Sequence, residues 1–226
     1  DHEPLDSAAF ESNESFIDTC EARVNTYLLG IKDSDLSEAS KRTYTEIMHA
    51  VGEFEQLGDY AENLYEQYTY IVDNNITFSD EALCEIGMMS NAAEEIIMIT
   101  AESFENSDGS RSQQIEALEE VIDILKETLK SKHIARLQAG LCTVKNGIPF
   151  LDIIHDLEKI GDHCSNISIY ILMYNDNGND FDIHEYRRVA EETAMNPSDK
   201  WREYYESKYL NMILSGDLSS LPRERG

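Results

Sequence analysis

Apolar side chains recur every three to four residues along most of this chain, which is the spacing of amphipathic helices. Only four prolines interrupt the pattern. Ser79-Asp80-Glu81 is a typical N-terminal capping sequence, and "NSDGS" at 106–110 is a turn sequence. The pattern predicts five helices, at residues 9–32, 35–74, 79–106, 111–139 and 145–174. Long helices with short connections form antiparallel bundles, so we expect an all-α protein.

A sequence repeat divides the chain further. The stretch "VGEFEQLGDYAENL" (51–64) matches "IHDLEKIGDHCSNI" (154–167) at a glutamate, a glycine, an aspartate and an asparagine. Both copies end the last long helix of a candidate bundle, and their offset of 103 residues is the length of a three-helix unit. We therefore predict two tandem antiparallel three-helix bundles.

The predicted units are a first bundle at residues 1–77, a second at 78–175 and a C-terminal helical extension at 176–226. The extension contains weaker helical stretches near 183–193 and 198–213. The first bundle is expected to lack its first helix, because too few residues precede Glu21 to match the helix at 79–106. Either that helix precedes Asp1 in a longer protein, as the missing initial Met suggests, or the extension covers the gap.

The chain is strongly acidic, with 45 acidic against 18 basic residues and a formal net charge of −27. Such a surface repels nucleic acid and anionic lipid, so neither is expected as a partner. Metal cations are the small partners that it favours. Four scattered cysteines without a CxxC pair indicate the reduced thiols of a cytoplasmic protein. No apolar run is long enough to predict a membrane-spanning helix.

Pairs of carboxylates four residues apart recur beside the apolar stripes of the predicted helices. At about 100° per residue, Glu158 and Asp162 fall on the shoulder of the stripe that Leu157 centres. The pairs that take this shoulder are Glu55 with Asp59, Glu119 with Asp123, and Glu158 with Asp162, with a weaker fourth copy in Glu21 and Asn25. Two copies therefore fall in each predicted bundle.

Carboxylates on neighbouring helices repel one another unless they are protonated or bind a cation. Oxygen ligands without sulfur favour a hard cation such as iron, manganese, magnesium or calcium. His155, one turn before Glu158, would extend the choice to zinc. The alternative is a solvated shoulder in which the acids pair with Lys159, Arg23 or Lys126. Periodicity alone does not decide between these two interpretations.

Two glycines lie on the apolar stripe beside the carboxylates, Gly58 and Gly161. A glycine inside a helix costs about 0.5–1 kcal/mol relative to alanine, so its presence needs a reason. We expect the missing side chain to let the neighbouring helix approach closely. That approach would bring Glu119 and Asp123 within reach of the acids on the last helix.

An enzymatic alternative is a carboxylate-bridged di-iron oxidase, which uses a Glu-x-x-His pair from each of two helices. Glu46 with His49 and Asp152 with His155 have this spacing. The two pairs do not align in the repeat, and one begins with aspartate. No nucleophile elbow or phosphate-binding glycine loop is present, so nothing in the sequence nominates a catalytic group. We expect a protein that is not an enzyme.

The repeated motifs "FEQLGDYAENL" and "LEKIGDHCSNI" resemble the signature of PhoU-domain proteins, which carry a Glu-x-x-x-Asp motif in two tandem three-helix bundles. The longer stretch "KSKHIARLQAGLCTVKNGIPFLDIIHDLEKIGDHCSNI" (130–167) is similar to the cytoplasmic PhoU-like region of bacterial type II sodium/phosphate cotransporters. The tail "IHEYRRVAEE…YYESKYL" (183–210) resembles the end of such proteins. The resemblance covers residues 15 to 210.

The resemblance implies a regulatory module linked to phosphate uptake, with iron or zinc clusters held on the bundle surface by the acidic motifs. The metal ligands that it implies are Glu55 and Asp59 in the first bundle, and Glu119, Asp123, Glu158 and Asp162 in the second. Asn25 stands where the family pattern has an aspartate, which weakens the first site.

The function expected from the resemblance is that of the cytoplasmic, metal-binding PhoU-like domain of a sodium-dependent phosphate transporter. Its expected partner is the membrane part of that transporter on the same longer chain, and association with further copies of itself is left open. The alternative is a free-standing PhoU-type regulator of a phosphate ABC transporter and its sensor kinase.

Overall fold

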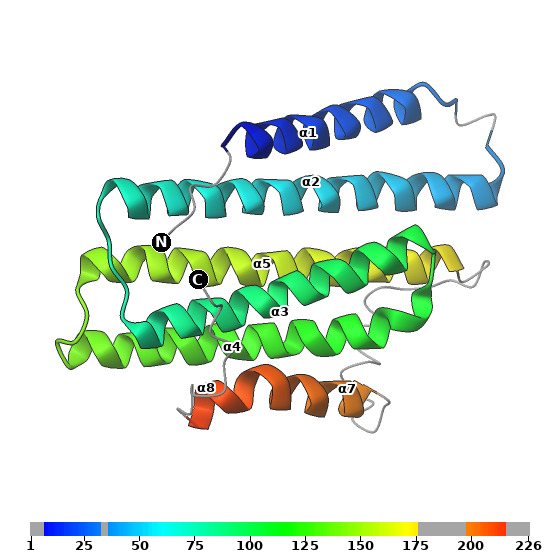
Figure 1. Ribbon diagram of the computed structural model, residues 1–226. Coiled ribbons are helices and arrows are strands. Elements are labelled where there is room, and N and C mark those ends of the chain that lie inside the picture. Colours follow the sequence, from blue (N-terminus) through cyan, green and yellow to red (C-terminus); the bar gives the residue numbers. More distant parts are fainter. Residues whose placement is uncertain (1–6, 33–35, 176–197, 216–226) are drawn as a thin grey trace.

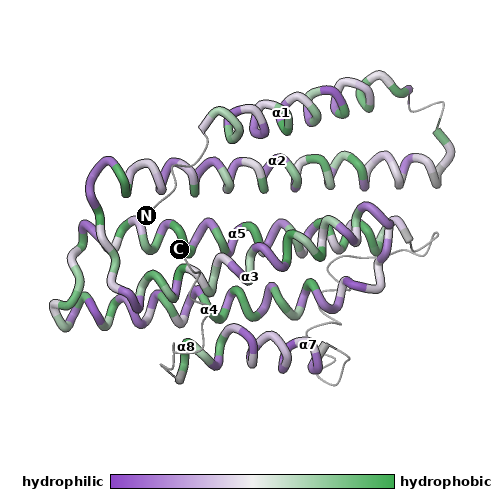
Figure 2. The backbone as a smooth tube through the Cα atoms, in the orientation of Figure 1, coloured by the Kyte–Doolittle hydropathy of each residue, from purple (hydrophilic) through white to green (hydrophobic). Residues whose placement is uncertain are grey.

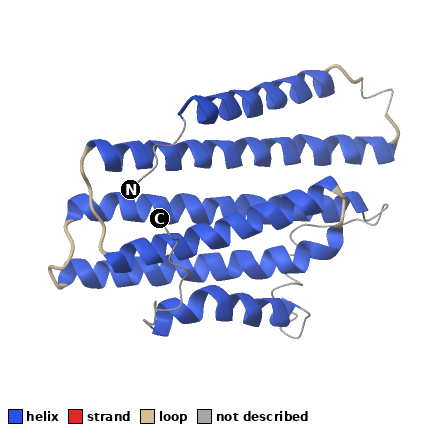
Figure 3. Ribbon diagram, viewed as in Figure 1, coloured by secondary structure: helices blue, strands red, loops and turns tan. Residues whose placement is uncertain are grey.

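The computed structural model describes residues 7–32, 36–175 and 198–215 of the chain. Within these residues every regular element is a helix (Figure 3). The five long helices are α1 (Ser7–Leu29), α2 (Glu38–Asp73), α3 (Asp80–Glu105), α4 (Ser112–Gln138) and α5 (Val144–Asn175). Each lies within a few residues of a predicted helix, which confirms the all-α class.

Short elements complete the described chain. A turn of 3-10 helix, η2 (Gly109–Arg111), joins α3 to α4. The tail is one continuous helical segment, made of α7 (Ser198–Tyr205), the π-helical turn η3 (Glu206–Leu210) and α8 (Asn211–Ser215). It agrees with the stretch predicted at 198–213, whereas the stretch predicted at 183–193 lies outside the described residues.

Serine side chains cap the N-termini of two long helices. The Ser79 hydroxyl accepts the backbone N–H of Ala82 at the start of α3, as its capping sequence predicts. The Ser37 hydroxyl accepts the N–H of Ser40 at the start of α2. Each cap satisfies a backbone donor that has no partner inside the helix and marks the residue where the helix begins.

The helices α3, α4 and α5 form a three-helix bundle with one continuous apolar core. Figure 2 shows hydrophobic positions recurring between hydrophilic ones along all three helices, which is the periodicity that predicted them. The core is built from the fully buried side chains of Met89 and Ile96 on α3, Leu118 and Ile122 on α4, and Ile154 on α5. This bundle is the rigid support of the acidic face described below.

The helices α1 and α2 form a hairpin that lies along α5 (Figure 1). Among the described residues of this hairpin the buried apolar side chains are few, with Leu28 on α1 and Ala50 on α2. Phe16 and Tyr27 on α1 remain about two-thirds exposed or more, at 68% and 72%. The described part of the chain therefore supplies two helices to the first unit and three to the second.

The described tail does not cover the gap in the first unit. It packs on α4 and α3, on the side of the bundle away from α1 and α2 (Figure 1). Tyr205 is fully buried there and its hydroxyl accepts a hydrogen bond from Gln114 Nε2 at 2.8 Å. The Tyr209 hydroxyl donates to a carboxylate oxygen of Glu95. Of the two alternatives for the missing helix, the one in which the extension covers the gap is therefore wrong for residues 198–215.

Among the residues described, no helix combines the length and apolar character needed to cross a membrane.

Candidate cation site on the α4–α5 face

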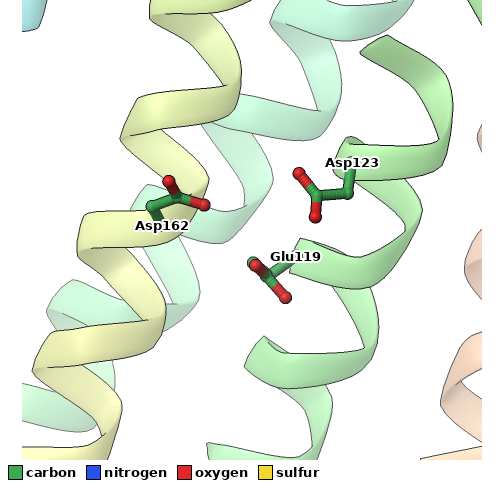
Figure 4. Close-up of side chains that lie close together, drawn as sticks. All are labelled: Glu119, Asp123 and Asp162. Atoms are coloured by element: carbon green, nitrogen blue, oxygen red, sulfur yellow. The ribbon is translucent and has the colours of Figure 1, made fainter. Parts of the chain in front are cut away.

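Three carboxylates from two neighbouring helices converge at the edge of the α3–α5 bundle. Glu119 and Asp123 lie one turn apart on α4, and Asp162 faces them from α5 (Figure 4). One oxygen of each group lies within 4.8 Å of the others. We call Glu119, Asp123 and Asp162 the carboxylate triad. The packing of Leu118 and Ile122 into the core places the two α4 acids on this shoulder, as the sequence pattern predicts.

Burial and neighbouring negative charges raise the pKa values of two carboxyl groups of the triad. Burial raises the pKa of Glu119 to about 8, and the charges of Glu116, Asp123 and Asp162 add to the shift. Burial also raises the pKa of Asp123, followed by the charges of Glu158 and Asp162. Each shift means that ionising the group costs free energy in the folded protein, a cost that a bound cation would offset.

Glu158 lies beside the triad but has other partners. It is buried, its Oε2 lies 2.9 Å from Lys126 Nζ, and its Oε1 lies 3.3 Å from Lys159 Nζ. Burial alone would raise its pKa, but the hydrogen bond and charge of Lys126, with the charge of Lys159, bring the pKa below its ordinary value. Glu158 is therefore an ionised carboxylate whose oxygens already face cations.

Lys159 also reaches the triad itself. Its Nζ lies 2.6 Å from Asp162 Oδ2, one helical turn away on the same face of α5. The pairing with Lys126 and Lys159 is what the solvated-shoulder interpretation expects, and the converging triad is what the metal interpretation expects. The structure contains both features, because the lysines bind Glu158 and Asp162 while Glu119 and Asp123 face one another on α4.

His155 does not join the triad. Its Nδ1 lies 3.7 Å from Glu158 Oε2, and its side chain is about half exposed. The donor set of the triad is therefore oxygen from three carboxylates, without a nitrogen ligand. Such a set suits a hard divalent or trivalent cation, so of the two ions that the sequence resemblance implies, the residues present fit iron better than zinc.

Gly161 faces α4 as expected, but the side chains around it do not pack tightly enough to require a glycine. A methyl group at Gly161 would lie 3.5 Å from two side-chain carbons of Ile122 and 3.9 Å from Glu119 Cγ. These are ordinary van der Waals distances. The helices approach closely here, yet alanine would fit, so a demand for glycine is not supported.

The α1–α2 hairpin carries a second, looser group of acids. Glu55 and Asp59 lie on α2 as predicted, and Gln56 Nε2 donates to Glu55 at 2.8 Å and to Asp59 at 3.5 Å. Burial raises the pKa of Asp59, and the charges of Glu55, Glu62 and Asp18 raise it further. The acid that approaches from α1 is therefore Asp18.

The predicted α1 partners of these acids were Glu21 and Asn25, and that assignment is wrong. Glu21 and Asn25 hydrogen-bond to each other at 2.9 Å. A methyl group at Gly58 would touch Ile17, just as one at Gly161 would touch Ile122. The helix α1 therefore packs two turns away from the register that was expected from Glu21.

The correct counterpart of the α4 motif is "ESFID" (14–18), which matches "EEVID" (119–123) at an offset of 105 residues. Glu14 and Asp18 thus correspond to Glu119 and Asp123. The charge of Asp18 raises the pKa of the exposed Glu14, and Glu62 and Asp59 contribute. This copy was detectable, because its offset is closer to the 103 residues of the main repeat than the offset of the copy that was chosen.

The geometry excludes the di-iron alternative. His49 stacks on Tyr170, with ring centroids 5.2 Å apart. On α5, Tyr170 lies 15 residues beyond His155, which is about 22 Å along a helix. The pair of Glu46 and His49 therefore does not meet the pair of Asp152 and His155.

The chain is similar to known proteins in both sequence and structure. Residues 86–171 match the family model described as PhoU domain. The chain is similar to the phosphate-specific transport system accessory protein PhoU homolog 1 of Thermotoga maritima, with 22% identity over 121 residues. That alignment covers 54% of this chain and 51% of the relative, so the chain spans about half the length of the curated relative it matches.

A solved structure agrees with the family match. The crystal structure of PhoU from Pseudomonas aeruginosa is similar with a TM-score of 0.67 at 13% identity, covering 76% of this chain and 81% of that chain. At this identity the likeness shows the fold alone, and it confirms the PhoU-like helical bundles expected from the sequence. The family model thus matches a PhoU domain at residues 86–171, and the curated relative and the solved structure are both PhoU proteins.

Proposed function

We propose that this protein is a PhoU-type regulator of phosphate transport that binds a metal cation at the carboxylate triad. The observation that carries the proposal is the match of residues 86–171 to the PhoU domain, together with the curated relative that is a phosphate-transport accessory protein. We place its action at the cytoplasmic face of the membrane and assign it a regulatory role without catalysis.

The relatives support one of the two expected arrangements better than the other. The curated relative and the solved structure described above are both PhoU proteins. We therefore favour a PhoU-type regulator that acts on a separate phosphate transporter over a domain of a cotransporter on the same chain. The sequence likeness of residues 130–167 to cotransporter regions remains the argument for the second arrangement.

The regulatory role is tested by phosphate uptake in the cells that make this protein. Disrupting its gene is expected to alter the rate of phosphate accumulation in phosphate-rich medium, and a plasmid-borne copy should restore it. A copy with Glu119→Ala and Asp162→Ala tests whether the triad is required. Unchanged phosphate accumulation in the disrupted strain would contradict the role.

The metal is tested separately, by elemental analysis of purified protein after reconstitution with iron, zinc or manganese. The three-carboxylate donor set supports binding of one of these ions, and Glu119→Ala/Asp162→Ala is expected to remove it. The reserve candidates are magnesium and calcium, which the same donors suit. Metal that persists in the double variant would place the site elsewhere in the chain.

A further inference from the structure

The molecule has two acidic faces: the α4–α5 face with the carboxylate triad, and the α1–α2 face with Glu55 and Asp59. The two faces differ in the residues that contact their acids. On the α4–α5 face, Lys126 and Lys159 contact Glu158 and Asp162. The repeat offsets assign Glu21 to the position of Lys126 and Gln56 to the position of Lys159. One face therefore has two ammonium groups where the other has an acid and an amide.

Lys159 bridges two acids of its own helix. Its Nζ lies 2.6 Å from Asp162 Oδ2 and 3.3 Å from Glu158 Oε1. Its side chain is 31% exposed, so the ammonium group has a path into solvent. Hydrogen bonding to Asp162 raises the pKa of Lys159, against a smaller opposing effect of burial, so the group is charged at neutral pH.

Gln56 makes the same bridge without a charge. Its Nε2 lies 2.8 Å from Glu55 Oε2 and 3.5 Å from Asp59 Oδ2, the acids that correspond to Glu158 and Asp162. The chain thus contains a natural neutral version of the Lys159 bridge. Replacing Lys159 by glutamine therefore removes the charge and keeps a side chain that makes this bridge elsewhere in the same protein.

An ammonium group and a metal ion bound by the triad would both interact with the carboxylate of Asp162. Two cations held by this one carboxylate would lie only a few ångströms apart and would repel one another strongly. We therefore expect Lys159 to leave Asp162 when a metal ion binds the triad. Lys126 contacts Glu158 and not the triad, so its displacement is not required.

We propose that Lys159 is a built-in competitor for the cation of the α4–α5 face, and that it sets the metal concentration at which this face is filled. The inference rests on the cation site proposed above. In the absence of metal, Lys159 offsets part of the charge of the triad and so stabilises the metal-free fold. On the α1–α2 face the residue that bridges Glu55 and Asp59 is the neutral Gln56, and the described side chains place no ammonium group in that bridge.

The test is a titration of metal-free full-length protein with Mn²⁺, followed by calorimetry and by electron paramagnetic resonance of the free ion. An Asp59→Asn background removes the contribution of the α1–α2 acids. Lys159→Gln, which copies Gln56, is expected to tighten Mn²⁺ binding by about tenfold, because an ion pair no longer has to be broken. Lys159→Arg, which keeps the charge, should bind Mn²⁺ no more tightly than the parent.

A matched control is Lys130→Gln on α4. Lys130 pairs with Glu127 one turn away, as Lys159 pairs with Asp162, but on an exposed surface outside the triad. This variant is expected to bind Mn²⁺ as the parent does. A second readout is the melting temperature of the metal-free protein, which Lys159→Gln should lower and which Mn²⁺ should then raise by more than in the parent.

The outcomes separate this inference from the site on which it depends. If Lys159→Gln binds Mn²⁺ no more tightly than the parent while Asp162→Asn weakens binding, the cation site stands and the competitor role is wrong. If Asp162→Asn also leaves binding unchanged, or if neither the parent nor Lys159→Gln binds Mn²⁺, both proposals are wrong. Binding by Lys159→Gln alone would support the competitor role.

Discussion

Glu119 shows how one side chain links the acidic face to the stability of the bundle. Its pKa is raised from 4.5 to about 8, first by burial and then by the neighbouring charges of Glu116, Asp123 and Asp162. Between these two pH values Glu119 binds more protons in the folded protein than in the unfolded chain. The contribution of Glu119 to the free energy of unfolding of the metal-free protein should therefore fall as the pH rises from about 4.5 to about 8.

Glu119→Gln removes the ionisable group and keeps the shape of the side chain. We expect this variant to lose that part of the pH dependence and, at pH 8, to be more stable than the parent by about 1 kcal/mol. Urea unfolding of metal-free protein at pH 5 and pH 8 measures it. Glu127→Gln on the exposed face of α4 is the control, and equal pH profiles for the two variants would contradict the assignment.

Two helical glycines differ in the space around them, which gives a matched pair of substitutions. A methyl group at Gly147 would overlap His133 Nε2, and the His133 ring is buried and stacked on Phe150. Gly147→Ala should therefore destabilise the protein by about 1–3 kcal/mol, because the buried His133 ring would have to shift from its stacking on Phe150. Thermal or urea unfolding measures the change.

Gly87 on α3 is the other member of the pair, because a methyl group there would meet nothing within 4 Å. Gly87→Ala should stabilise the protein by about 0.5–1 kcal/mol through the higher helix propensity of alanine. Equal effects of the two substitutions would show that the His133 contact does not constrain α5.

At the scale of the elements, a buried ion pair joins α3 to α4. Glu85 is fully buried, and Arg136 donates to its two carboxylate oxygens at 2.9 and 2.7 Å. Lys132 Nζ lies 3.0 Å from the same group. Glu85→Ala would leave these cations without their buried partner, so we expect a loss of about 3–5 kcal/mol in the free energy of unfolding.

Glu81 provides the control for this pair. It lies on the surface, and its Oε1 is 3.0 Å from Nζ of the same Lys132. Glu81→Ala should cost no more than about 1 kcal/mol, as exposed ion pairs do. If the two variants unfold at the same urea concentration, the burial of Glu85 does not make its ion pair contribute more to stability than the exposed pair of Glu81.

The helices themselves were predictable, because their apolar period and capping residues are local features of the sequence. The packing register of α1 was not predicted. An acidic helix contains several pairs of polar residues with the Glu-x-x-x-Asp spacing, so the spacing alone does not show which pair lies in the interface. The choice between Glu14 and Glu21 depends on which residue meets Gly58, and that is a contact between helices. The pairing of Glu158 with Lys126 across two helices was proposed only as an alternative for the same reason.

An engineered disulfide tests the register of α1 directly. A Cβ atom at Gly58 would lie 4.0 Å from the Cβ of Ile17, within the range that disulfides require. In a Cys20→Ser background, Ile17→Cys with Gly58→Cys should form a disulfide on mild oxidation, visible by non-reducing electrophoresis. The matched pair Val24→Cys with Gly58→Cys represents the register first expected, and a disulfide there alone would contradict the structure.

At the scale of the whole molecule, the tail and the α1–α2 hairpin lie on opposite sides of the α3–α5 bundle (Figure 1). The sequence predicted the helical character of residues 198–213 but not the surface on which they pack. Their apolar side chains are mostly aromatic, and this composition does not identify the surface that buries them. The partners in the structure, Gln114 and Glu95, are polar residues that no periodicity argument identifies.

Docking of the tail should depend mainly on Tyr205. Its ring is fully buried between α4 and the tail, and its hydroxyl accepts a hydrogen bond from Gln114 Nε2 at 2.8 Å. Replacement by alanine removes a large buried side chain, which costs about 3–5 kcal/mol where the cavity does not collapse. Because most buried side chains of this core come from α3, α4 and α5, we expect Tyr205→Ala to release the tail and leave the bundle folded.

Hydrogen exchange of backbone amides measures both parts of this prediction in one experiment. In Tyr205→Ala, the amides of residues 198–215 should lose protection while those of α4 and α5 keep it. Tyr204 is the matched control, because it is the adjacent residue and its ring is 49% exposed. Tyr204→Ala should leave tail protection nearly unchanged. Loss of protection throughout α3–α5 in Tyr205→Ala would instead mean that the tail and the bundle fold as one cooperative unit.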